Sequence, residues 1–185
     1  MNKFKNIEFY SSPDGVILIN ETGNPVREFS DKDTDLIDYL SERIRNEYPE
    51  AYESLTKTYD KHKLNFQFFN YVIVRRFIRC NFSNYDTLNT DLDSEGLFHF
   101  EQVPCPMRGE CKGYKEICQP KFNSKLTERE IQVLKLYCQP LEVDPIADKL
   151  CLSPYTIEEH LKNIRRKTGL TNKAEMMKFV ETKMN

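Results

Sequence analysis

Three short helical patterns follow one another between residues 126 and 170, and each has apolar side chains on one face. Thr127 and Glu130 stand three residues apart at the start of the first pattern, which is the spacing of a capping box. The apolar positions recur with the 3.6-residue period of a helix. They are Ile131, Leu134 and Cys138 in the first pattern, Ile146, Ala147 and Leu150 in the second, and Ile157, Leu161 and Ile164 in the third.

The boundaries of these helices are also marked in the sequence. Asp144-Pro145 predicts the start of the second helix, with Asp144 as the cap, and Ser153-Pro154 repeats this signal for the third. Gly169 predicts its end. Two helices joined by a few residues, the second capped by Ser-Pro, indicate a helix-turn-helix, in which the outward side of the second helix enters the DNA major groove.

These residues, taken in order, identify a known pattern: residues 126–175 resemble the LuxR-type (GerE-type) DNA-binding domain of bacterial transcription regulators. The matching positions are Leu126-Thr127, Arg129-Glu130, Val133-Leu134, Ile146-Ala147, Leu150, Ser153-Pro154, Thr156-Ile157, His160, Asn163-Ile164, Lys167, Gly169 and Ala174-Glu175. The sequence departs from the family pattern at Pro140, Asp144, Pro145 and Glu158. Asp144 and Glu158 put negative charge where the family meets phosphate.

The resemblance implies a four-helix domain that binds double-stranded DNA. It also implies a homodimer through the last helix, where Ala174, Met177, Val180 and Met184 form an apolar stripe. We expect Lys162, Arg165, Arg166 and Lys167 to contact phosphate, although the solvated face of a helix would have the same composition. The complete set of expected DNA-binding residues is Ser153, Tyr155, Thr156, Glu158, Glu159, Lys162, Asn163, Arg165, Arg166 and Lys167.

The preceding residues predict a different, α+β module over residues 1–120, followed by the all-α domain over residues 121–185. Residues 5–29 contain three short runs of strand-forming residues separated by turns, which predict a small antiparallel sheet. Helices are expected over residues 30–48, 51–59 and 64–80. The last of these is rich in strand-forming residues, but its length favours a buried helix. A short strand is expected over Leu97–Phe100.

Four cysteines of this module are candidate metal ligands. Cys105, Cys111 and Cys118 are separated by Gly- and Pro-containing spacers, which allow the chain to turn back on itself, and Cys80 ends the third predicted helix. A structural zinc ion takes four such ligands in a tetrahedron. An iron–sulfur cluster is also held by four thiolates, and a loop with free thiols is the remaining interpretation.

Composition and charge narrow the classes of function. The chain has 39% hydrophobic and 30% charged residues, no apolar run long enough to cross a bilayer, and no apolar signal-peptide segment near its start. We therefore expect a cytoplasmic protein with no membrane association. Residues 125–185 carry a net charge of +2, against −4 for the remainder.

No catalytic motif accompanies these features. The sequence contains no phosphate-binding loop, no dinucleotide fingerprint and no nucleophile–base arrangement, and His62, His99 and His160 are scattered. We therefore predict a sequence-specific transcription regulator that is not an enzyme. The alternative is an adaptor that binds a protein through the helix-turn-helix, with the acidic residues of the third helix as its evidence. The operator, the input signal and the direction of regulation are not encoded in any pattern that we recognise.

Overall fold

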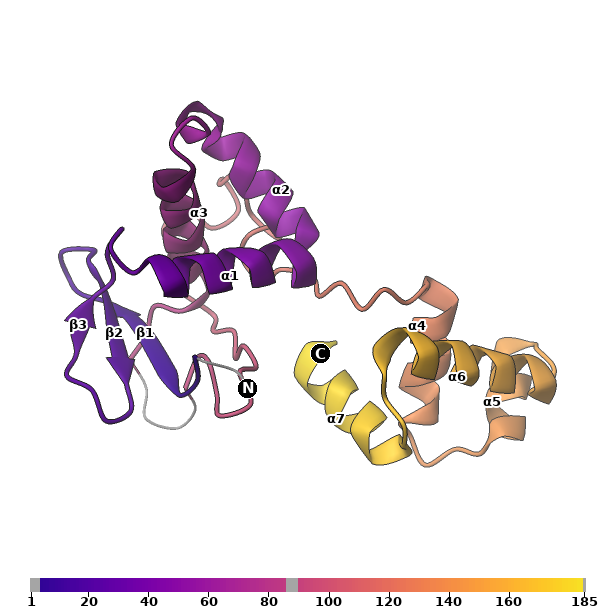
Figure 1. Ribbon diagram of the computed structural model, residues 1–185. Coiled ribbons are helices and arrows are strands. Elements are labelled where there is room, and N and C mark those ends of the chain that lie inside the picture. Colours follow the sequence, from indigo (N-terminus) through magenta and orange to yellow (C-terminus); the bar gives the residue numbers. More distant parts are fainter. Residues whose placement is uncertain (1–3, 86–89, 185) are drawn as a thin grey trace. The chain divides into compact units, whose positions relative to one another are not determined.

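The computed structural model describes residues 4–85 and 90–184 (Figure 1). The chain divides into two compact units, Met1–Lys121 and Phe122–Asn185. Within the described residues, no helix combines the length and the apolar composition that crossing a membrane requires.

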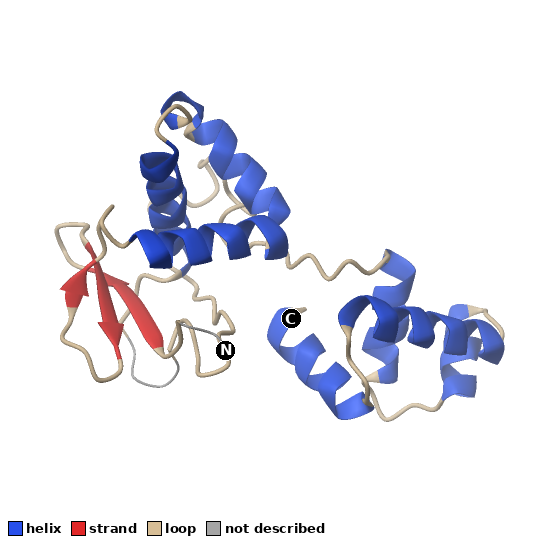
Figure 2. Cartoon of the chain, viewed as in Figure 1, coloured by secondary structure: helices blue, strands red, loops and turns tan. Residues whose placement is uncertain are grey.

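The first unit contains a three-stranded antiparallel sheet in the order β1-β2-β3, which confirms the predicted small sheet (Figure 2). The strands are β1 (Ile7–Ser11), β2 (Ile17–Glu21) and β3 (Arg27–Glu28). Phe9 pairs with Ile19 across β1 and β2, and both side chains are fully buried. Gly15 has a φ of 79° in the turn between them, a conformation that glycine adopts without steric cost.

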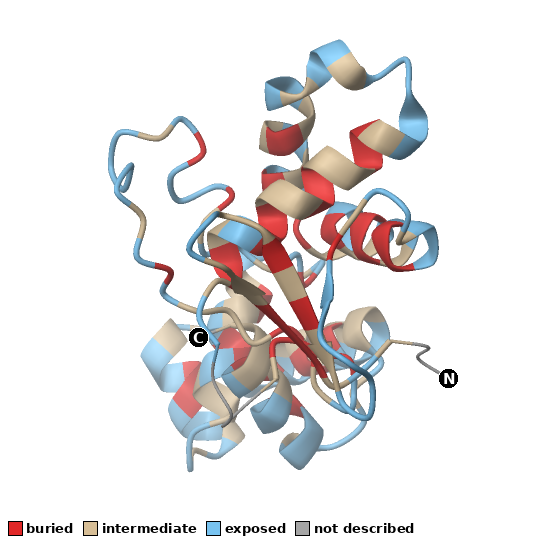
Figure 3. Ribbon diagram, turned by 90° about the vertical axis from the view of Figure 1, so that its left-hand side faces the viewer, coloured by how far each residue is buried: buried red, intermediate tan, exposed pale blue. Residues whose placement is uncertain are grey.

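Four helical elements follow the sheet: α1 (Thr34–Glu47), α2 (Pro49–Thr58), the 3-10 helix η1 (Asp60–His62) and α3 (Phe66–Asn81). The aromatic segment is therefore a helix, as its length predicted. The side chain of Asn65 caps α3 by accepting a hydrogen bond from the Phe68 N–H at 3.1 Å. Buried residues recur along one side of these helices (Figure 3).

The expected strand over Leu97–Phe100 is wrong. Phe98 forms a single isolated bridge with Leu92, and the segment has no ladder of hydrogen bonds. Its aromatic rings hold it in place instead. Phe100 lies 5.2 Å from Tyr48 and 5.4 Å from Phe82, measured between ring centroids, so it joins the aromatic core of α1 and α3.

The second unit consists of α4 (Glu128–Tyr137), α5 (Val143–Leu150), α6 (Pro154–Thr168) and α7 (Lys173–Lys183), which confirms the predicted four-helix domain. Its buried core is aliphatic and draws on all four helices. The core residues are Val133, Leu134, Ile146, Ala147, Ile157, Leu161, Ile164, Met176 and Val180.

One helix boundary in the second unit differs from the sequence prediction. The second helix begins two residues earlier than expected, at Val143, so Glu142 occupies the cap position without a side-chain cap hydrogen bond, and Asp144 lies in the first turn. The prediction of Asp144 as the cap is therefore wrong. Cys151 ends α5 in the left-handed conformation with a φ of 52°, where glycine or asparagine is more usual.

Candidate nucleic-acid interface

Helix α6 is positioned by its termini and by its apolar face. The Ser153 side chain accepts a hydrogen bond from the Thr156 N–H at 3.1 Å, and Pro154 occupies the first turn, as predicted. Gly169 ends the helix with a φ of 76°. Ile157, Leu161 and Ile164 are buried in the domain core, so the opposite side of α6 faces solvent.

This outward side carries most of the residues that the sequence predicted to bind DNA. Tyr155 has 72% of its surface exposed. The other exposed members are Ser153, Glu158, Lys162, Arg165 and Arg166, and the half-buried ones are Thr156, Glu159, Asn163 and Lys167. All ten residues therefore come from α6 and its cap, within one continuous segment.

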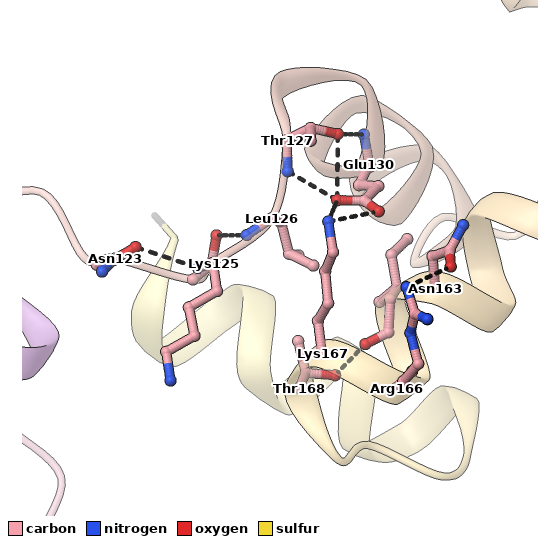
Figure 4. Close-up of polar contacts among 11 residues, drawn as sticks. Asn123, Lys125, Leu126, Thr127, Glu130, Asn163, Arg166, Lys167 and Thr168 are labelled. Atoms are coloured by element: carbon pink, nitrogen blue, oxygen red, sulfur yellow. Dashed lines mark hydrogen bonds and ion pairs between the residues drawn. The ribbon is translucent and has the colours of Figure 1, made fainter.

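The cations of this face differ in how strongly they are held. Lys162 Nζ lies 3.2 Å from Glu159 Oε1, and Arg166 donates a hydrogen bond to Asn163 Oδ1 at 3.0 Å (Figure 4). Arg165 and Glu158 form no side-chain interaction within the described part of the chain. Exposed pairs of this kind contribute little to stability, so these cations remain able to bind an external anion.

Lys167 is different, because it forms an ion pair inside its own domain. Its Nζ lies 2.6 Å and 2.9 Å from the two carboxylate oxygens of Glu130, a residue that is only 4% exposed (Figure 4). Glu130 also accepts a hydrogen bond from the Thr127 N–H at 2.7 Å, which completes the predicted capping box of α4. The pair thus links α6 to α4.

The electrostatics of Glu130 follow from these contacts. Burial alone would raise the pKa of its carboxyl group, but the hydrogen bonds from Lys167 and Thr127 outweigh this and lower the pKa below its ordinary value of 4.5. At neutral pH the carboxylate is therefore ionised, and the Lys167 ammonium is neutralised from within the domain.

Sequence reasoning missed these contacts between helices. Arg129, which matched the family pattern, donates a hydrogen bond from Nη2 to the carbonyl oxygen of Leu150 at 2.6 Å and so connects α4 to the end of α5. The presence of Arg129, Glu130 and Lys167 in the matching pattern was the available signal. Periodicity alone does not show which partner a charged side chain has in another helix.

The apolar stripe predicted on the last helix is divided between core and surface. Val180 is 8% exposed and belongs to the domain core, and Met184 packs against that core. Ala174 and Met177 are exposed. Two of the four residues are thus used within the domain, and only the other two are available to a partner.

This four-helix arrangement agrees with a comparison of the sequence with known families. Residues 124–180 match the family of bacterial regulatory proteins described as the luxR family. These residues form a LuxR-type domain. A curated relative, Protein TraJ of Escherichia coli, is 38% identical over 58 residues. That match covers 31% of this chain and 39% of TraJ, so the chain matches less than half of the length of that relative.

Outside the LuxR-type domain, the structure brings the four predicted metal-ligand cysteines to one place. Cys80, near the end of α3, lines a cavity of about 390 Å³ together with Cys105, Cys111 and Cys118. All four are free thiols and are partly buried. No three of their sulfur atoms, all within described residues, lie within 4.8 Å of one another. Cys138 packs against the LuxR-type core instead, and Cys151 is exposed.

Proposed function

We propose that this protein is a sequence-specific DNA-binding transcription regulator that contacts double-stranded DNA through α6. The observation that carries the proposal is the exposed, charged side of α6 within a LuxR-type domain. In a helix-turn-helix, the N-terminal part of the second helix approaches base edges in the major groove. We therefore assign Tyr155, Thr156 and Glu159 to base contacts.

The basic residues further along α6 are assigned to the DNA backbone. Lys162, Arg165 and Arg166 are exposed, and within the described residues Lys162 and Arg166 bond only to the half-buried Glu159 and Asn163 of the same helix. Phosphate contacts by such residues supply affinity that is independent of sequence and sensitive to salt. Lys167 is removed from this set, because its ion pair with Glu130 commits its charge to the domain interior.

The acidic residues of α6 repel DNA phosphates, unless they form a hydrogen bond with a base. Glu158 is exposed and repels phosphate, whereas Glu159 can accept a hydrogen bond from a cytosine amino group. Glu159 also holds Lys162, so a base contact at Glu159 would position that lysine as well. The proposal therefore gives the two glutamates opposite roles in specificity.

We also propose that the DNA-bound form is a homodimer that uses the exposed Ala174 and Met177 of α7. Dimers bind two half-sites on one face of the duplex, which increases both affinity and specificity. The dimer rests on the LuxR-type resemblance and on these two exposed apolar side chains. The oligomeric state can be measured by analytical ultracentrifugation with and without duplex.

The first experiment selects genomic fragments with the full-length protein at moderate salt and measures binding by electrophoretic mobility shift. Enrichment of a few fragments supports the regulator. Arg165→Ala should weaken binding to all duplexes alike and lower the slope of log K against log salt by about one. Lys135→Ala is the matched control, because it removes one exposed charge from α4 and should leave the slope unchanged.

Two further variants distinguish the effect of charge on DNA affinity from the recognition of a specific base. Glu158→Lys should raise affinity for unrelated DNA, and Glu159→Ala should reduce the preference for the selected fragments over unrelated ones. If the wild-type protein binds no duplex even at low salt, the regulator is excluded. The exposed Glu158 would then support the adaptor function, in which both changes impair a protein complex instead.

A further inference from the structure

We propose that Cys80, Cys105, Cys111 and Cys118 together bind one thiophilic metal centre through four thiolate bonds. This site belongs to the α+β module, outside residues 124–180, which match the LuxR family. It is therefore independent of the DNA-binding proposal, and neither depends on the other.

The first argument is the convergence of these side chains from separate segments. Cys80 comes from the last turns of α3, whereas the other three come from residues 105–118, which form turns without helix or strand. All four line the same cavity. The other two cysteines of the chain, Cys138 and Cys151, lie in the second unit. Every cysteine of the α+β module thus reaches this cavity.

The second argument is that the segment carrying three of these cysteines has little other support. Residues 101–121 contain no helix or strand, and only a few of their side chains, such as Val103 and Ile117, are buried. Asn81 provides the main polar connection. Its amide donates to the Ile117 carbonyl oxygen at 2.9 Å and accepts from the Gln119 N–H at 3.1 Å. A bound metal would connect this segment to α3 through strong bonds, which small, irregular structures commonly require.

The third argument concerns charge. Four thiolates around a divalent ion carry a net charge of −2, which needs compensation in a partly buried site. Arg76 donates a hydrogen bond from Nη2 to Cys111 Sγ at 3.5 Å, and Arg79 and Arg108 line the same cavity. Glu101 also lines it, but its carboxylate accepts the backbone N–H groups of Ser83 and Asn84. The cavity is thus more basic than acidic, as an anionic metal–thiolate centre requires.

Two occupants share this ligand chemistry. A zinc ion with Zn–S bonds of about 2.3 Å holds its sulfurs about 3.8 Å apart, so the cysteines would have to move inward from their present spacing. An iron–sulfur cluster is held by four thiolates spread around a larger body. Both are four-thiolate centres, and the experiment distinguishes them.

The test measures metal in the full-length protein, purified without oxygen, by elemental analysis for zinc and iron and by assay of acid-labile sulfide. We expect either about one zinc per chain, or iron with matching sulfide and visible absorbance. Serine substitution at any of the four cysteines should remove the metal. Cys151→Ser is the matched control, because this exposed thiol lies in the other unit, and it should retain the full metal content.

A second measurement does not depend on whether the cysteine variants fold. Metal-free wild-type protein is titrated with cobalt(II), whose absorption reports thiolate ligation, while hydrogen exchange is followed in peptides from residues 101–121. We expect saturation at one equivalent, with slower exchange in these peptides. The proposal is overturned if the wild-type protein contains no metal and takes up none, or if single serine variants retain it.

Discussion

The two units of this protein assemble their candidate sites in different ways. The LuxR-type domain places its ten candidate DNA-binding residues on one helix and its cap, over positions 153–167. The α+β module collects four cysteines from positions 80–118 into one cavity. A site on a single helix is specified by the helical period, whereas a site around a cavity depends on the packing of segments that are distant in sequence.

The cores of the two units also differ, because one is built from regular helices and the other includes irregular segments. The LuxR-type core is formed by aliphatic side chains and one methionine, Met176, from four regular helices. The core of the α+β module includes a group of aromatic rings that joins helices to irregular chain, with Phe77 in contact with Tyr48, Phe82, Phe98 and Phe100. In this module, aromatic contacts hold the irregular segments in place where a sheet would use backbone hydrogen bonds. Truncation of one of these aromatic side chains should therefore destabilise segments that have no regular secondary structure.

The largest expected effect follows from this difference. Phe77 is 1% exposed, so Phe77→Ala should reduce the stability of the α+β module by about 4 kcal/mol. Hydrogen exchange by mass spectrometry is a suitable measurement, because the chain has no tryptophan for fluorescence. Exchange should accelerate in residues 66–82 and 97–101, and peptides from residues 128–183 should be unaffected.

Leu161→Ala is the reciprocal control for that comparison. Leu161 is buried in the LuxR-type core, and its truncation should accelerate exchange across α4, α5 and α6 instead. If either substitution accelerates exchange throughout both units, the two units unfold together and not independently.

A smaller effect is expected from the ion pair that links α4 to α6. Glu130→Ala removes both the capping box and the partner of Lys167, and should cost about 3 kcal/mol. Glu130→Gln preserves the possibility of the capping box and removes only the charge, so its cost should be about 1.5 kcal/mol. Equal losses in urea unfolding of the two variants would show that the ion pair, rather than the cap, provides the stability.

These contacts also show how far the sequence could predict the structure. Helix starts at Thr127 and Ser153 were predicted because a cap is a local hydrogen bond between residues three apart. The pairing of Glu130 with Lys167 joins positions on different helices, and no local rule specifies it. The same limit applies to Lys167, because its position in the sequence does not indicate its ion pair with Glu130.

The α+β module was harder to predict for a related reason. Alternation of apolar residues in 97–100 resembled a strand, but Phe98 and Phe100 are held by aromatic contacts with α1 and α3. The cysteine spacing drew attention to four side chains that line one cavity. It contained no information about Arg76, which approaches Cys111 from one turn of α3 before Cys80.

The pH dependence of stability tests the ion pair between Glu130 and Lys167 in the wild-type protein. The pKa of Glu130 is lowered by folding, so its contribution to stability is complete above 4.5, the ordinary value, and is lost as pH falls through the lower folded value. Stability of the LuxR-type domain should therefore be level from neutral pH to about 5 and fall below that. Glu130→Gln should show a shallower acid loss, and an identical pH profile would contradict the assignment.

The smallest expected effect is at Ser153, where two substitutions should change stability and DNA binding in opposite directions. Ser153→Ala removes the side chain that caps α6, and should lower the stability of the LuxR-type domain by about 1 kcal/mol. Ser153→Asp retains a capping oxygen and adds a negative charge that the helix dipole favours, so stability should be unchanged or slightly higher.

The same negative charge would face the DNA phosphates in the proposed complex, and should weaken binding at low salt more than at high salt. Ser153→Ala should therefore bind DNA nearly as well as wild type while being less stable, and Ser153→Asp should show the opposite behaviour. Mobility shifts and urea unfolding, measured on both variants, test whether the two substitutions have these opposite effects on DNA affinity and on stability. If affinity simply follows stability in both variants, the start of α6 does not lie against DNA.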